Sequence, residues 1–289
     1  MKKIYKLLII MMLFIGSVSV LTGCDNTDTE KDQIYASFYI TYDFTKKIVG
    51  DKYEVINLVP TGMEPHEYVP TTDEINGLYS CKLFIVNGLD LEGYLSDLDD
   101  TILDKTVIAS TGIEAYTVSK ALDPHIWNSI PNAIKMLENI ASAVIEMDPD
   151  NAAYYQTNLE EYTYLFNALD AKIRLDLAGL SCKTLITAHH SFGYFAKEYD
   201  LTYYSICGLS ASDEPSTSDL NAIIDMIKRD NIPTIFSEEL ESEDNVNVIK
   251  NETQCRTASL NPIGGITDTA DDYLTVMSNN LITIVKELS

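Results

Sequence analysis

The chain has 289 residues, of which 46% are apolar and 22% are charged. This length predicts about two domains, and the composition excludes a disordered tail, a collagen-like fibre and a polytopic membrane protein. Asp and Glu total 44 against 20 Lys and Arg, so the formal charge is −24. Because a chain of this sign repels phosphate backbones, we expect no nucleic-acid partner.

The N-terminal segment has the features of a secretory signal. Lysines within the first six residues precede an uncharged apolar run over residues 7–21. This run is shorter than the roughly 20 residues that a spanning helix needs, so we predict a signal over residues 1–23 and not a transmembrane anchor. The run closes on the sequence LTGC at Cys24, which resembles a bacterial lipobox with a lipidated cysteine. The resemblance implies an extracytoplasmic protein anchored to the cell membrane by lipid on Cys24, with polar residues 24–33 as a flexible tether.

The rest of the chain shows two similar series of strand-like and helix-like segments. Such alternation is typical of βαβ units with a parallel sheet. The predicted strands are Ile34–Ile40, Val55–Val59, Leu83–Val86 and Thr106–Ala109, and then Thr184–Ala188, Tyr203–Ile206, Thr234–Phe236 and Thr257–Leu260. We therefore predict an α/β fold with two similar lobes, residues 34–148 and 179–289. Each lobe is expected to hold a four-stranded, mainly parallel sheet with flanking helices.

A long amphipathic pattern separates the two series. Apolar residues recur at steps of three and four, as one face of a helix requires: Tyr155, Leu159, Tyr162, Phe166, Leu169 and Ile173. Pro149 is tolerated in a first helical turn, and Gly179 is a typical helix stop. We predict a rigid linking helix over residues 149–178 that lets the lobes rock only slightly.

Besides Cys24, the chain holds four cysteines, namely Cys81, Cys182, Cys207 and Cys255. Their spacing fits no CxxC metal or redox motif, and both disulfides and buried thiols are compatible with it.

Histidine is rare in the chain, which holds only His66, His125, His189 and His190. His66 follows the second predicted strand, and His189 follows the strand Thr184–Ala188. Ligands of open parallel sheets bind outside the carboxyl ends of strands, so these positions favour a shared site. With His125, which precedes a predicted amphipathic helix, they are the candidate metal ligands.

Five motifs in register resemble the zinc/manganese solute-binding lipoproteins of ABC transporters. They are Pro60-Thr61-Gly62 through Glu64-Pro65-His66-Glu67-Tyr68, Asp123-Pro124-His125-Ile126-Trp127, His189 with Ser191 to Lys197, Glu214-Pro215-Ser216, and Leu260-Asn261-Pro262-Ile263-Gly264. The resemblance covers essentially the whole mature chain. It implies two α/β lobes bridged by a rigid helix, with the metal held between the lobes.

The resemblance also implies the ligands. His66 and His125 match the two ligands of the first lobe, and His189 matches the first ligand of the second lobe. His189 stands three residues before Phe192, where the family pattern places this ligand. A one-residue shift of the loop would exchange His189 for His190. Asp268 matches the usual fourth ligand, a carboxylate. Nearby alternatives to it are Asp271, Asp272 and Glu238, or a water molecule.

Three imidazoles and one carboxylate are a ligand set that zinc favours. Family members that prefer manganese often carry a glutamate in place of the third histidine, which suits a harder ion. We therefore expect Zn²⁺ as the transported ligand, with Mn²⁺ or iron as the alternative. The resemblance implies delivery to a permease driven by a cytoplasmic ATPase, and we expect a monomer. A zinc-dependent hydrolase is disfavoured because no HExxH motif is present, and nothing in the sequence indicates an adhesin.

Overall fold

The computed structural model describes residues 31–210, 213–240, 242–265 and 272–289. The predicted signal, the lipidation site Cys24 and most of the tether lie outside these ranges. Residues Asp32–Ser289 form one compact unit, within which the predicted boundaries of the lobes stay a prediction. Among the helices that the structure describes, none is both long enough and apolar enough to cross a membrane.

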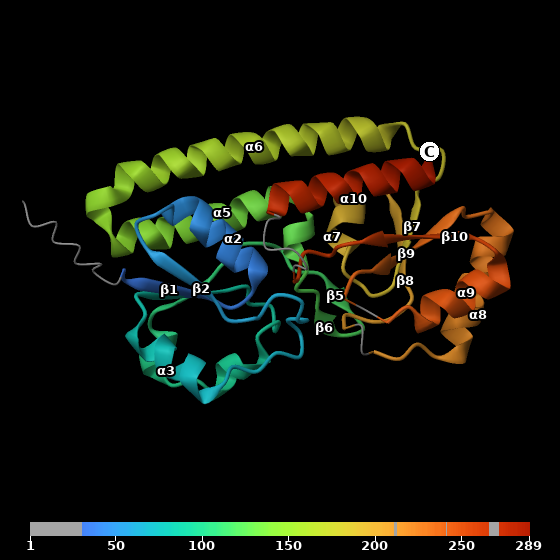
Figure 1. The fold of residues 1–289 in the computed structure, drawn as a ribbon. Helices are drawn as coiled ribbons and strands as arrows, with labels where there is room; N and C mark the ends of the chain where they lie inside the picture. The colour runs from blue at the N-terminus through green and yellow to red at the C-terminus, as the bar shows by residue number, and fades with distance from the viewer. Residues whose placement is uncertain (1–30, 211–212, 241, 266–271) are drawn as a thin grey trace, which may run out of the picture. The chain divides into compact units, whose positions relative to one another are not determined.

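The first half of this unit contains a four-stranded parallel sheet in the order β2-β1-β3-β4. Figure 1 labels β1 and β2 of this sheet and helices α2 and α3. Its elements are β1 (Gln33–Ala36), α2 (Tyr39–Val49), β2 (Glu54–Asn57), α3 (Thr72–Ser80), β3 (Leu83–Val86), η1 (Gly93–Asp97), α4 (Asp100–Leu103) and β4 (Thr106–Ile108). Side chains alternate between the faces of a strand. In β3, Ile85 joins the apolar core beneath α2, whereas Phe84 and Val86 pack in a smaller cluster with Leu78 of α3. Both faces of the sheet are therefore covered.

The second half repeats this arrangement with the strand order β10-β9-β7-β8. Its elements are β7 (Thr184–Thr187), α7 (Gly193–Glu198), β8 (Thr202–Ser205), α8 (Thr217–Asp230), β9 (Thr234–Glu238), α9 (Asp244–Thr253), β10 (Arg256–Leu260) and α10 (Tyr273–Leu288). Leu185 faces the main core, and Ile186 faces a cluster beneath α8 and α9. The predicted α/β fold class with two four-stranded sheets is confirmed.

The first strand is shorter than predicted. Strand β1 ends at Ala36, within the apolar run Ile34–Ile40, and α2 begins at Tyr39. The hydroxyl of Thr41 accepts a hydrogen bond from the backbone N–H of Phe38, as in a helix N-terminal cap. In a short apolar run, the spacing of apolar residues does not distinguish a strand from a buried helix. The predicted strand was therefore too long.

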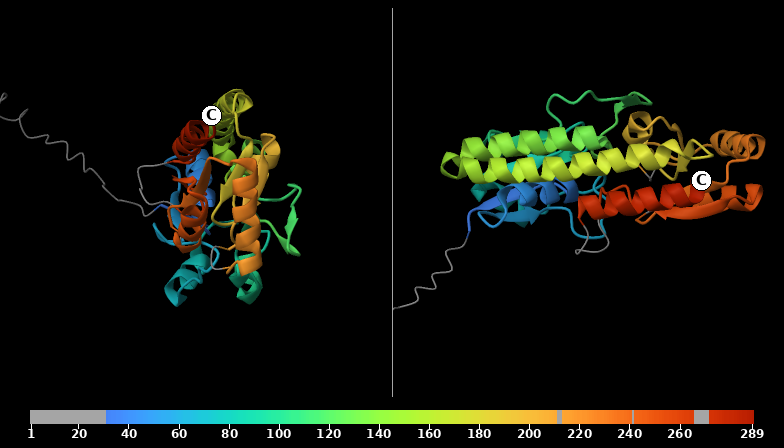
Figure 2. Two further views of the ribbon diagram at one scale, coloured as in Figure 1. Left: turned by 90° about the vertical axis from the view of Figure 1, so that its right-hand side faces the viewer. Right: turned by 90° about the horizontal axis from the view of Figure 1, so that it is seen from above.

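A hairpin and a pair of long helices connect the two sheets. Strands β5 (Thr117–Val118) and β6 (Ala121–Leu122) form an antiparallel hairpin that the sequence did not predict. The chain continues through η2 (Ile126–Asn128), α5 (Ile130–Met147), η3 (Pro149–Asn151) and α6 (Ala152–Ala178). Helix α6 has 27 residues and packs on α2 and α5 as well as on α10, as Figure 2 shows from above. The predicted long linking helix is thus present, and it contacts helices from both halves.

Three aromatic rings join the halves beneath α6. Phe166 of α6 stacks on Tyr273 of α10 with the ring centroids 4.9 Å apart, and Phe44 of α2 meets both rings edge-on. Beside them, the buried Lys47 of α2 bonds Asp43 at 2.9 Å and Asp272, just before α10, at 3.0 Å. Apolar and ionic contacts therefore fasten α10 to α2 and α6.

The buried carboxylate of Glu92 fixes the loop after β3. It accepts hydrogen bonds from the Ser37 hydroxyl at 2.6 Å and from the backbone N–H groups of Asn87 and Gly88 at 2.7 and 3.0 Å. Asn87 in turn donates its side-chain amide to the carbonyl of Pro124 at 3.1 Å. Glu92 therefore supports, through this loop, the segment that carries His125.

Replacing Glu92 with alanine is expected to lower the free energy of unfolding by about 1–3 kcal/mol, because buried donors lose their acceptor. Urea denaturation of the metal-free protein measures this loss. Glu92→Gln keeps one acceptor oxygen and should cost less. Equal stability of Glu92→Ala and the parent chain would contradict the structural role assigned to this carboxylate.

Candidate metal centre

Three loops bring three histidines to one point. His66 lies in the loop after β2, His125 immediately precedes η2, and His189 follows β7. The Nε2 atom of His125 lies 3.0 Å from Nε2 of His66 and 3.3 Å from Nε2 of His189. One nitrogen of each ring lies within 4.8 Å of the others. Ligands held at about 2.0–2.1 Å around one tetrahedral zinc are about 3.3 Å apart, so this spacing suits a single ion.

Buried carboxylates lie beside two of these rings. Nδ1 of His125 lies 2.8 Å from Oδ1 of Asp123, and Nδ1 of His189 lies 2.6 Å from Oε2 of Glu238. A carboxylate on one ring nitrogen leaves the other nitrogen free to bind a metal and fixes the direction of its lone pair. The Asp123–His125 pair, which is joined by a hydrogen bond, has this arrangement. At His189 the Glu238 carboxylate lies close to Nδ1 but is not aligned for a hydrogen bond.

Sheet topology explains how Glu238 reaches His189. The order β10-β9-β7-β8 places β9 beside β7, and the chain leaves these two strands in opposite lateral directions. Loops diverge at such a switch point and leave room for side chains at the carboxyl ends of the strands. Glu238 ends β9 and His189 stands two residues beyond β7, so both side chains enter this space.

Burial keeps His66 and His125 neutral at physiological pH. Loss of solvation, followed by the proximity of His125 and His189, lowers the pKa of His66 to about 2. Burial also lowers the pKa of His125 well below its usual value, and the neighbouring histidines add to this effect. A neutral imidazole has the free lone pair that a metal ion requires. Few protons therefore compete with an ion at these two rings.

The free energy of unfolding of the metal-free protein is expected to fall as the pH is lowered from 7 to 5. Below about pH 6.5 histidines of the unfolded chain take up protons. In the folded chain burial lowers the pKa values of His66, His125 and His190. At these histidines the unfolded chain therefore binds more protons than the folded chain, so acid favours unfolding. Asp123, whose pKa burial raises to about 6, takes up a proton on folding and offsets one histidine.

Each proton that the unfolded chain binds in excess of the folded chain contributes roughly 1.4 kcal/mol per pH unit to the slope. Burial also raises the pKa values of Asp43 and Glu92, which reduces this excess. Urea denaturation in the presence of a chelator at several pH values measures the slope. His66→Asn should reduce the slope by about one proton. A profile that stays flat between pH 7 and pH 5 would contradict the burial of neutral histidines.

The other candidate ligands that the structure describes are not part of this histidine cluster. The ring of His190 packs against Tyr203 with the centroids 4.9 Å apart, and its Nδ1 lies 3.2 Å from the hydroxyl of Ser205. His189, and not His190, thus contributes its ring to the cluster with His66 and His125. Asp272 caps α10 through the Thr275 N–H. Asp268 and Asp271 lie outside the described residues, so the fourth ligand predicted from the sequence stays a prediction.

Sequence reasoning missed the orienting role of two acids. Asp123 precedes His125 in the motif that carries this histidine, and this spacing is the signal that could have identified it. Glu238 was considered only as a possible fourth ligand, whereas its carboxylate faces Nδ1 of His189. The contact joins residues 49 positions apart, so no local pattern of the sequence reveals it.

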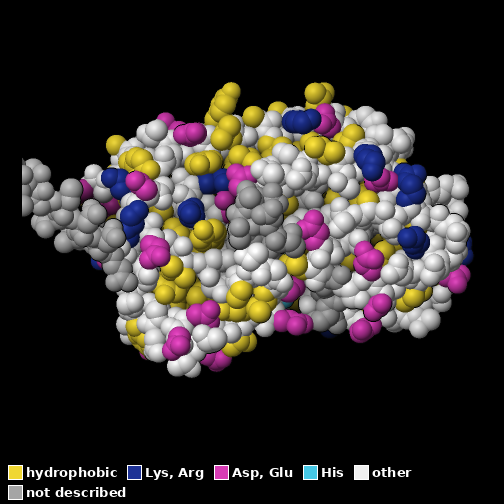
Figure 3. All heavy atoms as spheres, viewed as in Figure 1, with side chains coloured by type: hydrophobic (Ala, Val, Ile, Leu, Met, Phe, Trp, Pro, Cys, Tyr) yellow, Lys and Arg dark blue, Asp and Glu magenta, His cyan; other side chains and the backbone are white. Residues whose placement is uncertain are grey.

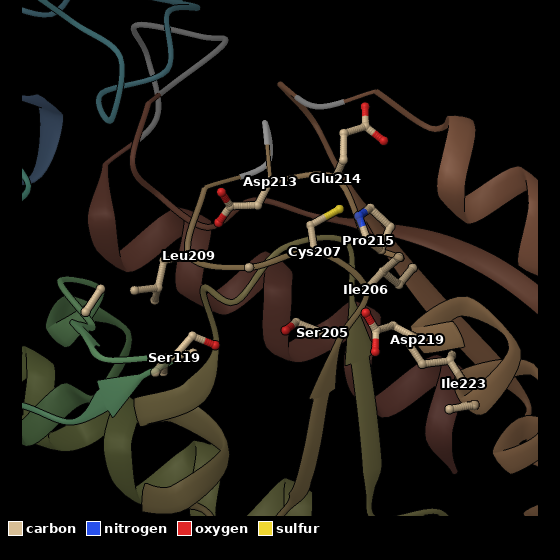
Figure 4. A pocket seen from close by; sticks show the side chains of 14 residues that line it. Ser119, Ser205, Ile206, Cys207, Leu209, Asp213, Glu214, Pro215, Asp219 and Ile223 are labelled. Atoms are coloured by element: carbon tan, nitrogen blue, oxygen red, sulfur yellow. The ribbon is translucent and has the colours of Figure 1, made fainter. Parts of the chain in front are cut away.

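A separate hollow of about 750 Å³ lies between the β5–β6 hairpin and α8. Figure 4 shows Cys207 and Ser205 in it, with the carboxylates of Asp213, Glu214 and Asp219 spread around it and not directed at one point. The cysteines of the described residues, Cys81, Cys182, Cys207 and Cys255, are free thiols. Acidic side chains are also spread over the face that Figure 3 shows, as the negative charge of the chain requires.

Known proteins resemble the chain over nearly its full length. The high-affinity zinc uptake system protein ZnuA of Bacillus subtilis is 31% identical, with 91% of this chain and 92% of the relative covered. The manganese-binding lipoprotein MntA of Halalkalibacterium halodurans is 28% identical over the whole of both chains. The laminin-binding protein Lmb of Streptococcus agalactiae, described as bifunctional with adhesin and metal-transporting activity, has a TM-score of 0.84 at 26% identity and covers 90% of this chain and 100% of its own.

The fold and the histidine cluster define the class of solute-binding proteins of metal transport. Residues 34–287 match the model of the family described as zinc-uptake complex component A, periplasmic. The chain belongs to this family. Its members are binding components of metal uptake and not enzymes, in agreement with the sequence-based expectation.

Proposed function

We propose that the chain captures zinc outside the cytoplasm and delivers it to the permease of an ABC uptake system. The observation that carries this proposal is the convergence of the ring nitrogens of His66, His125 and His189. Three imidazoles that each bring one nitrogen to the same point suit zinc better than harder ions, which favour oxygen ligands. The family match of residues 34–287 supports the same cargo.

The proposed ligands are His66, His125 and His189, with Asp268 as the fourth. A fourth protein ligand would close the coordination sphere, as a binding protein needs and a zinc hydrolase does not. The loops that carry His66 and His189 follow different sheets, so a bound ion would link the two halves of the chain. Contact with the permease would then have to weaken at least one of these bonds to release the ion.

Attachment to the membrane through lipid on Cys24 is part of this proposal. It is supported by the lipobox-like sequence and by the names of relatives that are called lipoproteins. Such an anchor would keep a monomeric binding protein near its permease.

Manganese is the alternative cargo, because one relative of equal length is named a manganese-binding lipoprotein. Competitive titration of the metal-free protein against chelators of known affinity tests the choice. We expect one zinc ion per chain and much weaker binding of manganese. Zinc always has an advantage over manganese at nitrogen-rich sites, so manganese retained in the presence of zinc would overturn the proposal.

A further inference from the structure

The segment that carries His125 also carries Trp127, the only tryptophan of the chain. The indole ring of Trp127 meets the ring of His125 edge-on, with the centroids 5.3 Å apart, and both side chains are buried. The indole N–H donates to the carbonyl of Pro262 at 2.8 Å, and the side-chain amide of Asn128 lies 3.4 Å from the same oxygen. A carbonyl from the second half of the chain therefore holds the indole against a proposed metal ligand.

Pro262 stands in a turn whose backbone is strained. The next residue, Ile263, has a φ angle of +64°, which lies in the left-handed region. A β-branched residue seldom adopts this conformation, because its β-carbon comes too close to the following carbonyl oxygen. Such strained residues persist only where the surrounding structure fixes them. The contacts around the turn must therefore hold Ile263, whose side chain is fully buried.

Two buried asparagines supply these contacts. The side-chain oxygen of Asn261 accepts a hydrogen bond from the N–H of Ile263 at 2.7 Å. Asn280 of α10 bonds both polar groups of the Asn261 backbone, since its Oδ1 accepts from the N–H at 3.0 Å and its amide donates to the carbonyl at 2.7 Å. The amide of Asn261 donates to the carboxylate of Glu239 at 2.9 Å. Loss of either asparagine would leave buried polar groups without their bonds.

Helix α10 reaches the Trp127 segment at two points. Tyr273 and Asn280 are two helical turns apart on the same face of this helix. The hydroxyl of Tyr273 donates to the main-chain carbonyl of Trp127 at 2.6 Å, whereas Asn280 holds the turn whose Pro262 carbonyl accepts the indole N–H. The main chain and the side chain of Trp127 are thus both tied to one helix of the second half.

Two contacts set the place of the His125 ring. The bond from Nδ1 to Asp123 at 2.8 Å fixes the direction in which Nε2 points, and the indole of Trp127 limits the displacement of the ring. A binding site needs its ligands within about 0.5 Å of their productive positions, and neighbouring side chains provide this precision. A shift of the indole would therefore move His125 relative to His66 and His189.

We propose that Asn261 and Asn280 are positioning residues of the metal centre. They hold Ile263 in its left-handed conformation, so that the Pro262 carbonyl keeps Trp127, and with it the ring of His125, in the place that the ion requires. Neither asparagine belongs to the histidine cluster, and both act through the turn. This inference rests on the proposed metal-binding function and adds the residues that place one of its ligands.

The fluorescence of Trp127 tests the first step of this proposal, because it is the only tryptophan emission of the chain. In the metal-free mature chain, Asn280→Ala should shift the emission maximum to longer wavelength and increase quenching by acrylamide, since the indole loses its fixed acceptor. Asn139→Ala is the matched control. The amide of Asn139 also donates to two main-chain carbonyls, those of Ala109 and Thr111 at 2.8 Å, but it does not support the turn. This variant should keep the emission of the parent chain.

Metal binding tests the second step. Competition with a chelator should show that the zinc affinity of Asn280→Ala falls about 3- to 10-fold, which is less than the 10- to 100-fold effect of a direct partner of a ligand. The visible absorption of bound cobalt should shift as well, because the ring of His125 changes its position. A loss of stability alone moves neither readout, so Asn139→Ala should leave both unchanged. If Asn280→Ala does not fold, Asn261→Ala removes the bond to Ile263 and tests the same role.

Ile263→Gly tests the contribution of the strained backbone. Glycine adopts a positive φ without strain, so the turn then needs less support from the asparagines. In the Ile263→Gly background, Asn280→Ala should therefore lower the zinc affinity less than it does in the parent chain, by a factor of about two or more. Equal losses in the two backgrounds would overturn the role assigned to the strained turn.

The outcomes separate this inference from the proposed function. If the parent chain binds no zinc, the proposed function fails, whereas the emission of the metal-free variants still tests the link between Asn280 and Trp127. If the parent chain binds one zinc and Asn280→Ala matches Asn139→Ala in all three readouts, only the positioning role is overturned. A shifted emission with unchanged zinc affinity and cobalt absorption overturns it too, because Trp127 would then move without moving His125.

Discussion

Alanine at His189 is expected to lower the zinc affinity of the protein by more than about 100-fold. Loss of a residue that only hydrogen-bonds a metal ligand already lowers the affinity about 10- to 100-fold, and loss of the ligand itself should cost more. The same holds for His66 and for His125, because each ring supplies one nitrogen to the cluster. Competition with a chelator measures the affinity. This is the largest effect on binding that the structure predicts for a single side chain.

His190→Ala is the control, because it removes the adjacent imidazole without touching the cluster. Its ring faces Ser205 and Tyr203, and its Nε2 atom lies 3.7 Å from Asp123, beyond hydrogen-bond distance. We expect its zinc affinity to match that of the parent chain. A large loss in His190→Ala together with normal binding in His189→Ala would mean that the two histidines have exchanged roles.

Phe166→Ala is expected to lower the free energy of unfolding by about 3–5 kcal/mol, the usual cost of removing a buried phenylalanine ring. Phe166 is fully buried and contacts the rings of both Phe44 and Tyr273, so its loss leaves a cavity where α2, α6 and α10 meet. Denaturant unfolding of the metal-free protein gives this value.

Tyr164 is the matched control on the same helix. Its side chain is 74% exposed, so Tyr164→Ala should change the stability by no more than about 0.5 kcal/mol. Similar losses in the two variants would show that α6 contributes little through its buried face, in conflict with the role of this helix as the link between the halves.

The fold could be predicted to a large extent from local patterns. The apolar stripe that contains Phe166 and Ile173 indicated α6, and short β-rich runs indicated the strands of both sheets. The start of α2 was missed because the apolar residues near Ile40 fit either a strand or a buried helix. The β5–β6 hairpin was missed because its strands have only two residues each.

The candidate site was predictable only in part. His66, His125 and His189 could be named because histidine is rare in the chain and each lies in a motif of the family. The roles of Glu238 and of Asn128, which bonds Ser191, depend on contacts between segments that are distant in sequence. These contacts arise from the packing of the two halves, so periodicity and spacing do not reveal them.

The metal content of the mature chain, purified without a histidine tag, tests the central claim most directly. Mass spectrometry of the metals in the purified protein should find one zinc per chain. Removal of this zinc in acid with a chelator, followed by return to neutral pH with equal zinc and manganese, should restore zinc alone. Absence of any bound metal in both preparations, or stoichiometric manganese despite available zinc, would contradict the assignment of a zinc-capturing protein.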